Sequence, residues 1–451
     1  MIHCFTVNGR HLVLDATSGA LHEVDKNAFA VIKVLQSTPK YINDPILLSN
    51  KLNLLPSIVN EILADVHKLI AAKQLFSPSK DAQVYTHMLN RNPVIKALCL
   101  HMAHACNLRC RYCFAGQGDY GQDHGLMSLE TGKKALDFLI ASSGSRRNLE
   151  VDFFGGEPML NFDTVKALVA YGREKENETN KCFRFTLTTN GSLLTEADHD
   201  YINTHFDNVV LSLDGRPQVN DKMRKIGKHG SYDTVYPKIK ALADARKHEN
   251  YYVRGTYTRE NLDFAADVLH LSDAGFAQIS VEPVVAPPRE DYSLRREDLP
   301  TLFAEYEKLA DALLLRKKEG TFINFFHFMM DLSGGPCLAK RVTGCGAGSE
   351  YLAITPSGKL FPCHQFVGDE KFLLGDLDTG IQNVDVVTKF SSCHVYSKPA
   401  CQDCWAKYYC SGGCMANAYY ANNDINIPDE IGCDLQRKRI ECALYMKAAM
   451  A

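Results

Sequence analysis

Residues 94–113 read VIKALCLHMAHACNLRCRYC, an apolar run followed at once by a cysteine-rich loop. The run predicts a strand, and the loop spaces its cysteines C-x3-C-x2-C at Cys106, Cys110 and Cys113. A [4Fe–4S] cluster held by only three thiolates keeps one iron open to a ligand that is not protein. A structural zinc site would need a further closing ligand, and none follows in this loop. The stretch therefore predicts a cluster with an open iron at the carboxyl end of a strand.

Apolar runs alternate with amphipathic helical patterns from this loop to about residue 319. The pattern predicts six strands, at residues 95–101, 149–154, 183–189, 208–213, 251–258 and 278–282. It predicts helices at 128–142, 161–178, 195–204, 232–248, 261–274 and 298–318. Repeated βα units predict an α/β fold with a parallel sheet, either a partial (β/α)6 barrel or an open doubly wound sheet. In both, the chemistry lies on loops at the carboxyl ends of the strands.

The cysteine loop, with Tyr112 before its last cysteine, resembles the signature of the radical S-adenosylmethionine (SAM) enzymes. Later strand ends carry motifs similar to those of that family, although each alone is also compatible with an ordinary turn or a solvated charge. The resemblance implies that a reduced cluster splits SAM into methionine and a 5′-deoxyadenosyl radical, which removes hydrogen from an inert C–H bond. It implies these SAM contacts: Tyr112, Gly155, Gly156, Glu157, Thr189, Asn190, Ser212 and Arg224.

A second group of cysteines lies in the last part of the chain, from residue 334 on. This part has few long apolar runs, so we expect metal rather than a core of its own to hold it. An ordinary zinc ribbon has two cysteine pairs and would leave several of these thiols unexplained. The spacing resembles the SPASM domain of peptide-modifying radical SAM enzymes, which implies two auxiliary clusters and therefore three [4Fe–4S] clusters in all.

The SPASM resemblance also implies how the thiols divide between the two auxiliary clusters. The more distant cluster takes Cys401, Cys404, Cys410 and Cys433. The nearer cluster takes Cys345, Cys363 and Cys414, and its remaining ligand stays open between Cys337 and a substrate thiolate. The other thiols fit no ligand pattern and are expected to be small, buried hydrophobic side chains: Cys4, Cys99, Cys182, Cys393 and Cys442.

Residues 1–80 form a separate module, which a polar linker at 77–81 joins to the rest. Asn8-Gly9 predicts a hairpin, and helical spacing follows at 25–35 and 57–75, in the outline of a small winged helix. The module resembles the peptide-recognition element of enzymes that modify ribosomally made peptides, which implies that a substrate leader pairs with an exposed strand. An oligomerisation element or a purely structural extension is the alternative.

Composition excludes several classes of protein. The chain has 451 residues, 16 cysteines and a net charge of −3, without a basic run, which argues against nucleic acid or a membrane surface as a partner. The N-terminus lacks the pattern of a signal peptide and no apolar stretch is long enough to span a membrane, so we expect a cytoplasmic protein. In a reducing compartment, clustered cysteines are more often metal or cluster ligands than disulfides.

The three parts, at 1–80, 93–320 and 334–442, together resemble the thioether-forming maturases of six-cysteine (SCIFF) peptides, of sactipeptide type. Residues 13–20, which read VLDATSGA, and Cys363-His364-Gln365-Phe366 carry this finer resemblance. It implies a crosslink between a cysteine sulfur and a carbon of another residue. It also implies a cysteine-rich precursor peptide bound through its leader and an electron donor such as a flavodoxin or ferredoxin. No catalytic acid or base is assigned.

Other functions fit the same motifs. An anaerobic sulfatase-type maturase, which makes formylglycine, shares the barrel and SPASM domain but does not need a leader-binding module. A maturase that forms carbon–carbon or ether crosslinks differs only in its product. A redox or iron-sensing protein would use the clusters without catalysis.

Overall fold

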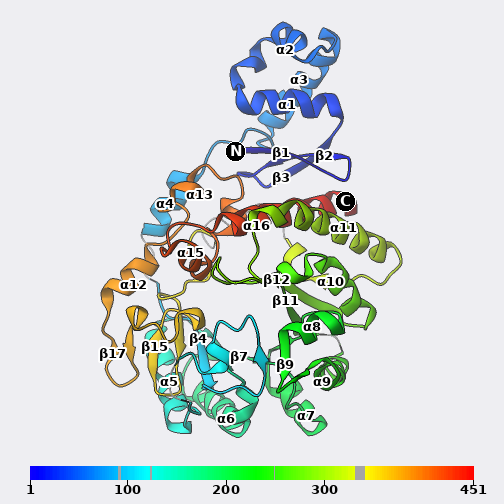
Figure 1. The fold of residues 1–451 in the computed structure, drawn as a ribbon. Coiled ribbons are helices and arrows are strands. Elements are labelled where there is room, and N and C mark those ends of the chain that lie inside the picture. The colour runs from blue at the N-terminus through cyan, green and yellow to red at the C-terminus, as the bar shows by residue number, and fades with distance from the viewer. Residues whose placement is uncertain (90–92, 122–123, 248, 331–340) are drawn as a thin grey trace.

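The computed structural model describes residues 1–89, 93–121, 124–247, 249–330 and 341–451. Figure 1 shows a small N-terminal module standing on a larger body. The body is built on a sheet with the strand order β13-β12-β11-β8-β7-β6-β4-β14-β15-β16-β17. Cys337 lies outside the described residues, so its role as a ligand stays a prediction.

Six parallel strands form the centre of this sheet and follow one another in chain order. They are β4 (Ala97–Ala103), β6 (Asn148–Gly155), β7 (Cys182–Thr189), β8 (Asn208–Ser212), β11 (Tyr251–Tyr257) and β12 (Gln278–Pro283). A doubly wound sheet reverses its strand order at a switch point. This order does not reverse, so of the two predicted arrangements the barrel-type one is observed.

Helices link these strands close to where the sequence predicts them. They are α5 (Leu129–Ser142), α6 (Phe162–Glu178), α7 (Glu196–His205), α9 (Tyr232–Ala245), α10 (Phe264–Asp273) and α11 (Leu299–Lys318). Val151 and Phe153 of β6 are fully buried, whereas Asp152, between them, and Phe154, after them, are partly exposed. Because side chains alternate along a strand, one face of the sheet packs in the apolar core and the other carries polar groups.

The cysteine-rich part continues the same sheet. β14 (Tyr351–Ile354) pairs in parallel with β4, and β15 (Lys359–Phe361), β16 (Gly375–Asp376) and β17 (Gly380–Ile381) follow in antiparallel order. Phe361, Phe366, Phe372 and Phe390 are buried together. These side chains pack with Cys99 of β4 and with Tyr120, so this part shares an apolar core with the barrel, and the expectation that metal holds it stays a prediction.

Short elements and one long helix complete the body. They are α4 (Asp81–Leu89), β5 (Arg109–Cys110), α8 (Pro217–Met223), β9 (Arg224–Ile226), β10 (His229–Gly230), β13 (Asn324–Phe325), α12 (Val384–Ser391), α13 (Pro399–Gln402), α14 (Lys407–Cys410), α15 (Met415–Asn422) and α16 (Glu430–Met450). Figure 1 shows α16 running beside α11 beneath the N-terminal module. No helix within the described ranges combines the length and apolar character needed to cross a bilayer.

The N-terminal module is a three-stranded antiparallel sheet followed by helices. Its elements are β1 (Ile2–Val7), β2 (Arg10–Asp15), β3 (Ala20–Val24), α1 (Lys26–Ser37), α2 (Pro45–Leu52) and α3 (Pro56–Ala71). Asn8 and Gly9 have φ of 46° and 79°, as a tight hairpin turn requires, so the predicted hairpin is confirmed. The sequence pattern did not reveal β3, and the winged-helix assignment stays a prediction.

One end of the module's sheet contacts both the linker and the body. The buried Asp15 carboxylate accepts hydrogen bonds from the backbone N–H of Thr17 (2.9 Å) and of Ser77 (2.8 Å) in the linker. The His3 ring stacks on Trp405, with ring centroids 3.8 Å apart, and its Nε2 lies 2.9 Å from Glu441 of α16. The module thus rests on the cysteine-rich part.

Candidate functional site

A cavity opens at the carboxyl ends of the barrel strands, where parallel α/β folds place their sites. Cys106, Cys110 and Cys113 all line it. Most of the predicted SAM contacts line it too: Tyr112, Gly155, Gly156, Thr189, Asn190, Ser212 and Arg224. The structure therefore brings together residues that the sequence places on four different strand ends.

Gly155 and Gly156 are needed for close contact with the cysteine loop. A Cβ on Gly156 would lie 2.1 Å from the carbonyl oxygen of Ala105, and one on Gly155, which has φ of +113°, would lie 2.5 Å from that of Ala103. The Gly156 N–H donates to the Ala103 carbonyl at 2.8 Å. The two glycines thus allow the end of β6 to support the backbone that leads into Cys106.

Glu157 is the one predicted SAM contact that does not line the cavity. Its carboxylate is fully buried and accepts hydrogen bonds from Thr189 Oγ1 (2.7 Å) and from the backbone N–H of Asn190 (2.8 Å). Burial raises the pKa of Glu157, although these hydrogen bonds oppose the rise. Glu157 therefore positions the end of β7 from behind the cavity wall.

Asn190 connects β7 to the first cysteine. Its Nδ2 lies 3.7 Å from Cys106 Sγ, and the Leu108 backbone N–H lies 3.4 Å from the same sulfur. Burial raises the pKa of the Cys106 thiol and raises that of Cys110 to about 12. Such thiols ionise when a cation binds them, and hydrogen bonds to a ligating sulfur tune the potential of a cluster. This donor set fits an iron–sulfur cluster.

Tyr112 lies between two charged side chains at the floor of the cavity. Its hydroxyl is 2.7 Å and 2.8 Å from the two carboxylate oxygens of Asp214 and accepts a hydrogen bond from Arg224 Nη1 at 2.9 Å. Burial raises the pKa of Asp214, and the positive charge of Arg224 opposes that rise. Arg224 keeps further N–H donors that can bind a carboxylate in the cavity. Sequence reasoning missed Asp214, because Asp-Gly after a strand is typical of a turn.

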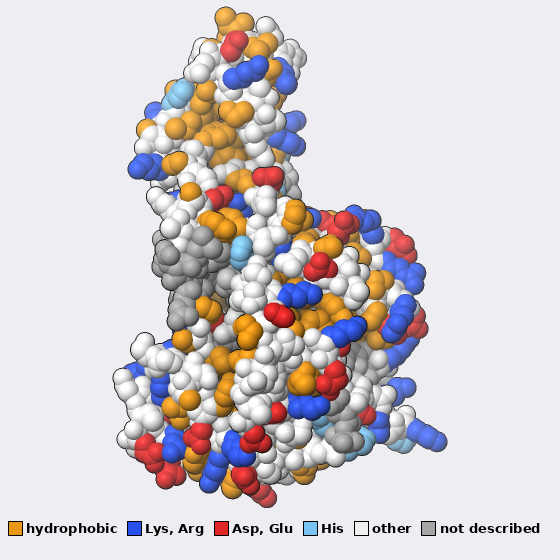
Figure 2. Space-filling view, turned by 90° about the vertical axis from the view of Figure 1, so that its left-hand side faces the viewer, with side chains coloured by type: hydrophobic (Ala, Val, Ile, Leu, Met, Phe, Trp, Pro, Cys, Tyr) orange, Lys and Arg blue, Asp and Glu red, His pale blue; other side chains and the backbone are white. Residues whose placement is uncertain are grey.

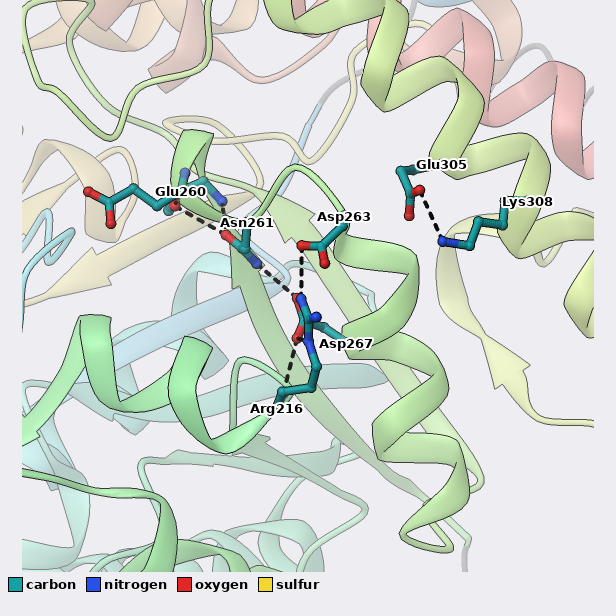
Figure 3. Close-up of polar contacts among 8 residues, drawn as sticks. Arg216, Glu260, Asn261, Asp263, Asp267, Glu305 and Lys308 are labelled. Atoms are coloured by element: carbon teal, nitrogen blue, oxygen red, sulfur yellow. Dashed lines mark hydrogen bonds and ion pairs between the residues drawn. The ribbon is translucent and has the colours of Figure 1, made fainter.

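A second polar network holds neighbouring strand ends together (Figure 3). Arg216, just after β8, donates to the buried Asp267 of α10 at 2.7 Å and to Asp263 at 2.8 Å. Asn261, in the loop after β11, donates to the other Asp267 oxygen at 3.1 Å. These bonds fix the loop after β8, which also carries Asp214, against the loop after β11 and the start of α10.

The opposite wall of the cavity holds charged and aromatic side chains that the sequence analysis did not assign. Arg254 of β11 lies 3.3 Å from Glu282 of β12, and both line the cavity beside His364. Burial would raise the pKa of Glu282, but Arg254 and other cations lower it below its usual value. Burial lowers the pKa of His364 to about 4, so the ring is neutral at pH 7. The sequence carried one signal for these two residues. Side chains alternate between the two faces of a strand, and Arg254 and Glu282 occupy the positions of β11 and β12 that face the cavity.

The predicted ligands of the more distant auxiliary cluster lie near one another. Burial raises the pKa of Cys401 and of Cys433 to about 11 each, and the neighbouring thiols Cys404 and Cys410 add to this rise. Within the described ranges, no three His, Cys, Asp or Glu side chains surround a point as ligands of one ion would. An iron–sulfur cluster does not need such a point, because each of its irons binds a different thiolate.

Among the predicted ligands of the nearer auxiliary cluster, Cys363 lies next in the chain to the cavity wall, and Cys345 and Cys414 lie near Cys363. Cys363 is buried, and its pKa is raised by burial and further by Cys414 and Cys345. His364, the next residue, lines the cavity. Cys393, which no ligand pattern includes, is buried close enough to Cys345 for that thiol to raise its pKa. This part of the chain therefore places thiols directly beyond the cavity wall.

Comparisons with known proteins agree with this geometry. Residues 96–236 match a family model described as a 4Fe-4S single cluster domain. The chain is 22% identical to the radical SAM cyclopropyl synthase TigE of Paramaledivibacter caminithermalis over 93% of this chain and 89% of that protein. It is 26% identical to a cysteine-type anaerobic sulfatase-maturating enzyme of Clostridium novyi over 69% of this chain and 85% of that protein.

A solved structure of similar fold covers nearly the whole chain. Streptococcus suis SuiB bound to the precursor peptide SuiA shares 16% identity and a TM-score of 0.53, covering 94% of this chain and 96% of that one. SuiB bound to S-adenosylmethionine gives the same TM-score at 17% identity. The fold is therefore the α/β radical SAM fold. The proteins that this chain resembles support a place among the radical SAM maturases as a group, without indicating which maturase it is.

Proposed function

We propose that this chain, as a relative of the radical SAM maturases, installs a thioether crosslink in a ribosomally made, cysteine-rich peptide. The observation that carries the proposal is the cavity, whose wall combines the three cysteines of the loop with Tyr112, Asn190 and Arg224. A cluster with an open iron and a SAM molecule beside it would account for each of these groups.

The residues of the cavity would bind SAM on one wall and the peptide on the other. A bound, reduced cluster supplies the electron that splits SAM into methionine and the 5′-deoxyadenosyl radical. Arg224 and Ser212 would bind the carboxylate of SAM, and Tyr112 would hold Arg224 in place. Arg254 and Glu282, on the opposite wall, would face the peptide. Forming each bridge removes two hydrogens from the peptide, one as an atom taken by the 5′-deoxyadenosyl radical and one as a proton from the thiol, and an auxiliary cluster would accept the electron that is left over.

The predicted site of the nearer auxiliary cluster favours a thioether over other crosslinks. Cys345, Cys363 and Cys414 are predicted to hold the nearer cluster, and His364 links them to the cavity wall. A metal-bound substrate thiolate is held deprotonated and oriented for attack. A site beyond the wall could thus present the substrate sulfur to the carbon from which hydrogen is removed.

The N-terminal module supports the choice of a peptide as substrate. Figure 2 shows hydrophobic side chains gathered on the surface of this module. A groove runs between β3 and α3, with Ile58, Ile62 and Leu69 among its lining residues and Glu61 and Asp65 beside them. β3 lies at the edge of its sheet, so a leader strand can pair with it and place side chains in the groove.

Product analysis tests the proposal against its alternatives. The reconstituted protein, SAM, a reductant and a cysteine-rich precursor peptide should yield 5′-deoxyadenosine and a peptide that lacks two hydrogens per bridge. A formylglycine maturase would remove sulfur from the peptide. A carbon–carbon or ether crosslink would leave every cysteine thiol free. A cluster protein that only senses redox state would release no 5′-deoxyadenosine.

A further inference from the structure

A short antiparallel ribbon covers the cysteine loop. β5 pairs with β9, and β9 pairs with β10, in a sheet separate from the barrel. Arg109 lies opposite Lys225, and Cys110 lies opposite Arg224. Residues directly opposite in an antiparallel pair share a face, and the face alternates at each step. Because Cys110 and Arg224 line the cavity, Arg109 and Lys225 lie on the outer face.

The outer face of this ribbon is positively charged. Arg109, Lys225 and Lys228 are all exposed. Arg111 and Lys222, at the edges of the ribbon, are exposed too but both form ion pairs with Glu260. In the part of the chain that the structure describes, neither Lys225 nor Lys228 has an ion-pair partner. The whole chain carries a net charge of only −3, so this cluster of cations is a local feature.

We propose that the outer face of the β5–β9–β10 ribbon is the docking surface for an acidic one-electron carrier protein of the flavodoxin or ferredoxin class. This inference rests on the proposed function, which requires a cluster at Cys106, Cys110 and Cys113. One electron leaves the reduced cofactor of the carrier and reduces the cluster, and no bond or proton changes place.

Position and charge together favour this surface. Electron transfer weakens steeply with distance, and Cys110 is itself a residue of the ribbon, so a carrier on its outer face is separated from the cluster by a single layer of backbone. Encounters between redox proteins bury small interfaces, often below about 1,200 Å², so a short ribbon is large enough. Clustered charge of one sign steers an oppositely charged partner and raises the association rate.

The test compares two reductants. The double variant Lys225→Glu/Lys228→Glu reverses the two unpaired cations without touching the cavity. Its control, Lys317→Glu/Lys318→Glu, reverses two cations at the end of α11, which lies near the N-terminal module in Figure 1, whereas β9 lies towards the other end of the body. Iron content and the visible spectrum should be the same in all three reconstituted proteins.

SAM cleavage is then driven either by dithionite or by a purified bacterial flavodoxin in its hydroquinone form. We expect Lys225→Glu/Lys228→Glu to lose at least about tenfold in the flavodoxin-driven rate at low salt, while its dithionite-driven rate and both rates of the control stay unchanged. Added salt should slow the wild type more than this variant, because screening removes the attraction. Direct binding of flavodoxin, measured by fluorescence anisotropy, should weaken in parallel.

Each other result has a defined meaning. The docking surface would be overturned if Lys225→Glu/Lys228→Glu kept both its flavodoxin-driven rate and its binding of flavodoxin. It would also be overturned if this variant lost its dithionite-driven rate of SAM cleavage to the same extent as its flavodoxin-driven rate. An equal loss in the α11 control would show a general charge effect and would also overturn it. If the wild type fails to cleave SAM even with dithionite, the proposed function fails instead, and the binding measurement alone decides the docking surface.

Discussion

At the scale of single residues, Tyr112 joins the cysteine loop to the end of β8, because its hydroxyl lies between Asp214 and Arg224. Removing that hydroxyl by Tyr112→Phe leaves two buried polar groups without their shared partner, which costs about 1–3 kcal/mol. We expect the KM for SAM to rise about five- to a hundredfold, since Arg224 loses its orientation.

Iron content distinguishes a weaker binding of SAM in Tyr112→Phe from a loss of the iron–sulfur cluster. Tyr112→Phe should keep the iron of the wild type, whereas Cys110→Ala should lose about four irons per chain. Cys182→Ala, on a cysteine that fits no ligand pattern, should lose none. A Tyr112→Phe protein with an unchanged KM for SAM would show that Arg224 does not bind the substrate carboxylate.

Asp152 should titrate near neutral pH. It faces the polar side of β6 and accepts a hydrogen bond from Thr188 Oγ1 at 2.9 Å, and burial raises its pKa to about 7. An unfolded aspartate has a pKa of about 3.9, so the folded protein holds one more proton between about pH 4 and 7. The stability that Asp152 contributes is therefore greatest below about pH 4 and falls as pH rises towards about 7.

Infrared spectroscopy checks this titration directly. The carboxylic acid C=O band of Asp152 should be present at about pH 5.5 and absent at about pH 8.5, and Asp152→Asn should lack it at both values. A wild-type spectrum without this pH-dependent band would show that Asp152 is already ionised in the folded protein.

The sequence predicted part of the cavity lining because Gly155, Gly156, Thr189, Asn190 and Ser212 lie at or directly after the ends of apolar strands, in stretches that resemble family motifs. Arg254 and Glu282 escaped prediction for a physical reason. A charged side chain within a strand pattern is usually exposed to solvent, and only the pairing of β11 with β12 brings these two residues together at the cavity.

At the scale of elements, the contact between the end of β6 and the cysteine loop is too close for any side chain. Gly156→Ala would force a Cβ to within 2.1 Å of the Ala105 carbonyl oxygen, so the backbone of the loop must move. We expect this variant to lose about four irons per chain after reconstitution while remaining folded. Iron analysis and circular dichroism are the measurements.

Gly320→Ala is the matched control. Gly320 has a positive φ, of +77°, which Gly156 does not, but a Cβ there meets nothing within 4 Å. The Gly320→Ala variant should lose only about 1 kcal/mol of stability through backbone strain, and it should keep all of its iron. Equal iron in the two variants would contradict the role of Gly156 in supporting the loop.

Strands and helices of the barrel were predictable because their apolar patterns are long and regular. The pairing of β14 with β4 was not, since β14 has only four residues and its partner lies about 250 residues earlier in the chain. A short apolar run near glycines and cysteines does not indicate which sheet it joins. For the same reason the sequence did not show that the cysteine-rich part extends the barrel sheet.

At the scale of the whole molecule, we propose that the N-terminal module recognises the peptide and that the chemistry takes place at the cavity. Ile62→Asp places a charge in the groove between β3 and α3, and should weaken binding of the leader at least about tenfold, because an aspartate replaces an apolar contact. SAM cleavage without peptide should be unchanged.

Ile70→Asp on the same helix is the control, because Ile70 is half-buried but does not line the groove. It should keep leader binding, measured by calorimetry with the synthetic leader. Equal loss of binding in both variants would indicate general damage to the module, and retained binding in Ile62→Asp would exclude the groove.

We propose that the cavity catalyses thioether formation, and the mass of the peptide product decides between this reaction and the alternatives. The reacted precursor is alkylated with iodoacetamide and analysed by tandem mass spectrometry beside the product of Cys110→Ala. The account predicts a loss of two hydrogens and one fewer alkylated cysteine for every bridge, with neither change in the variant. A peptide with unchanged mass and fully alkylated cysteines, despite release of 5′-deoxyadenosine, would contradict it.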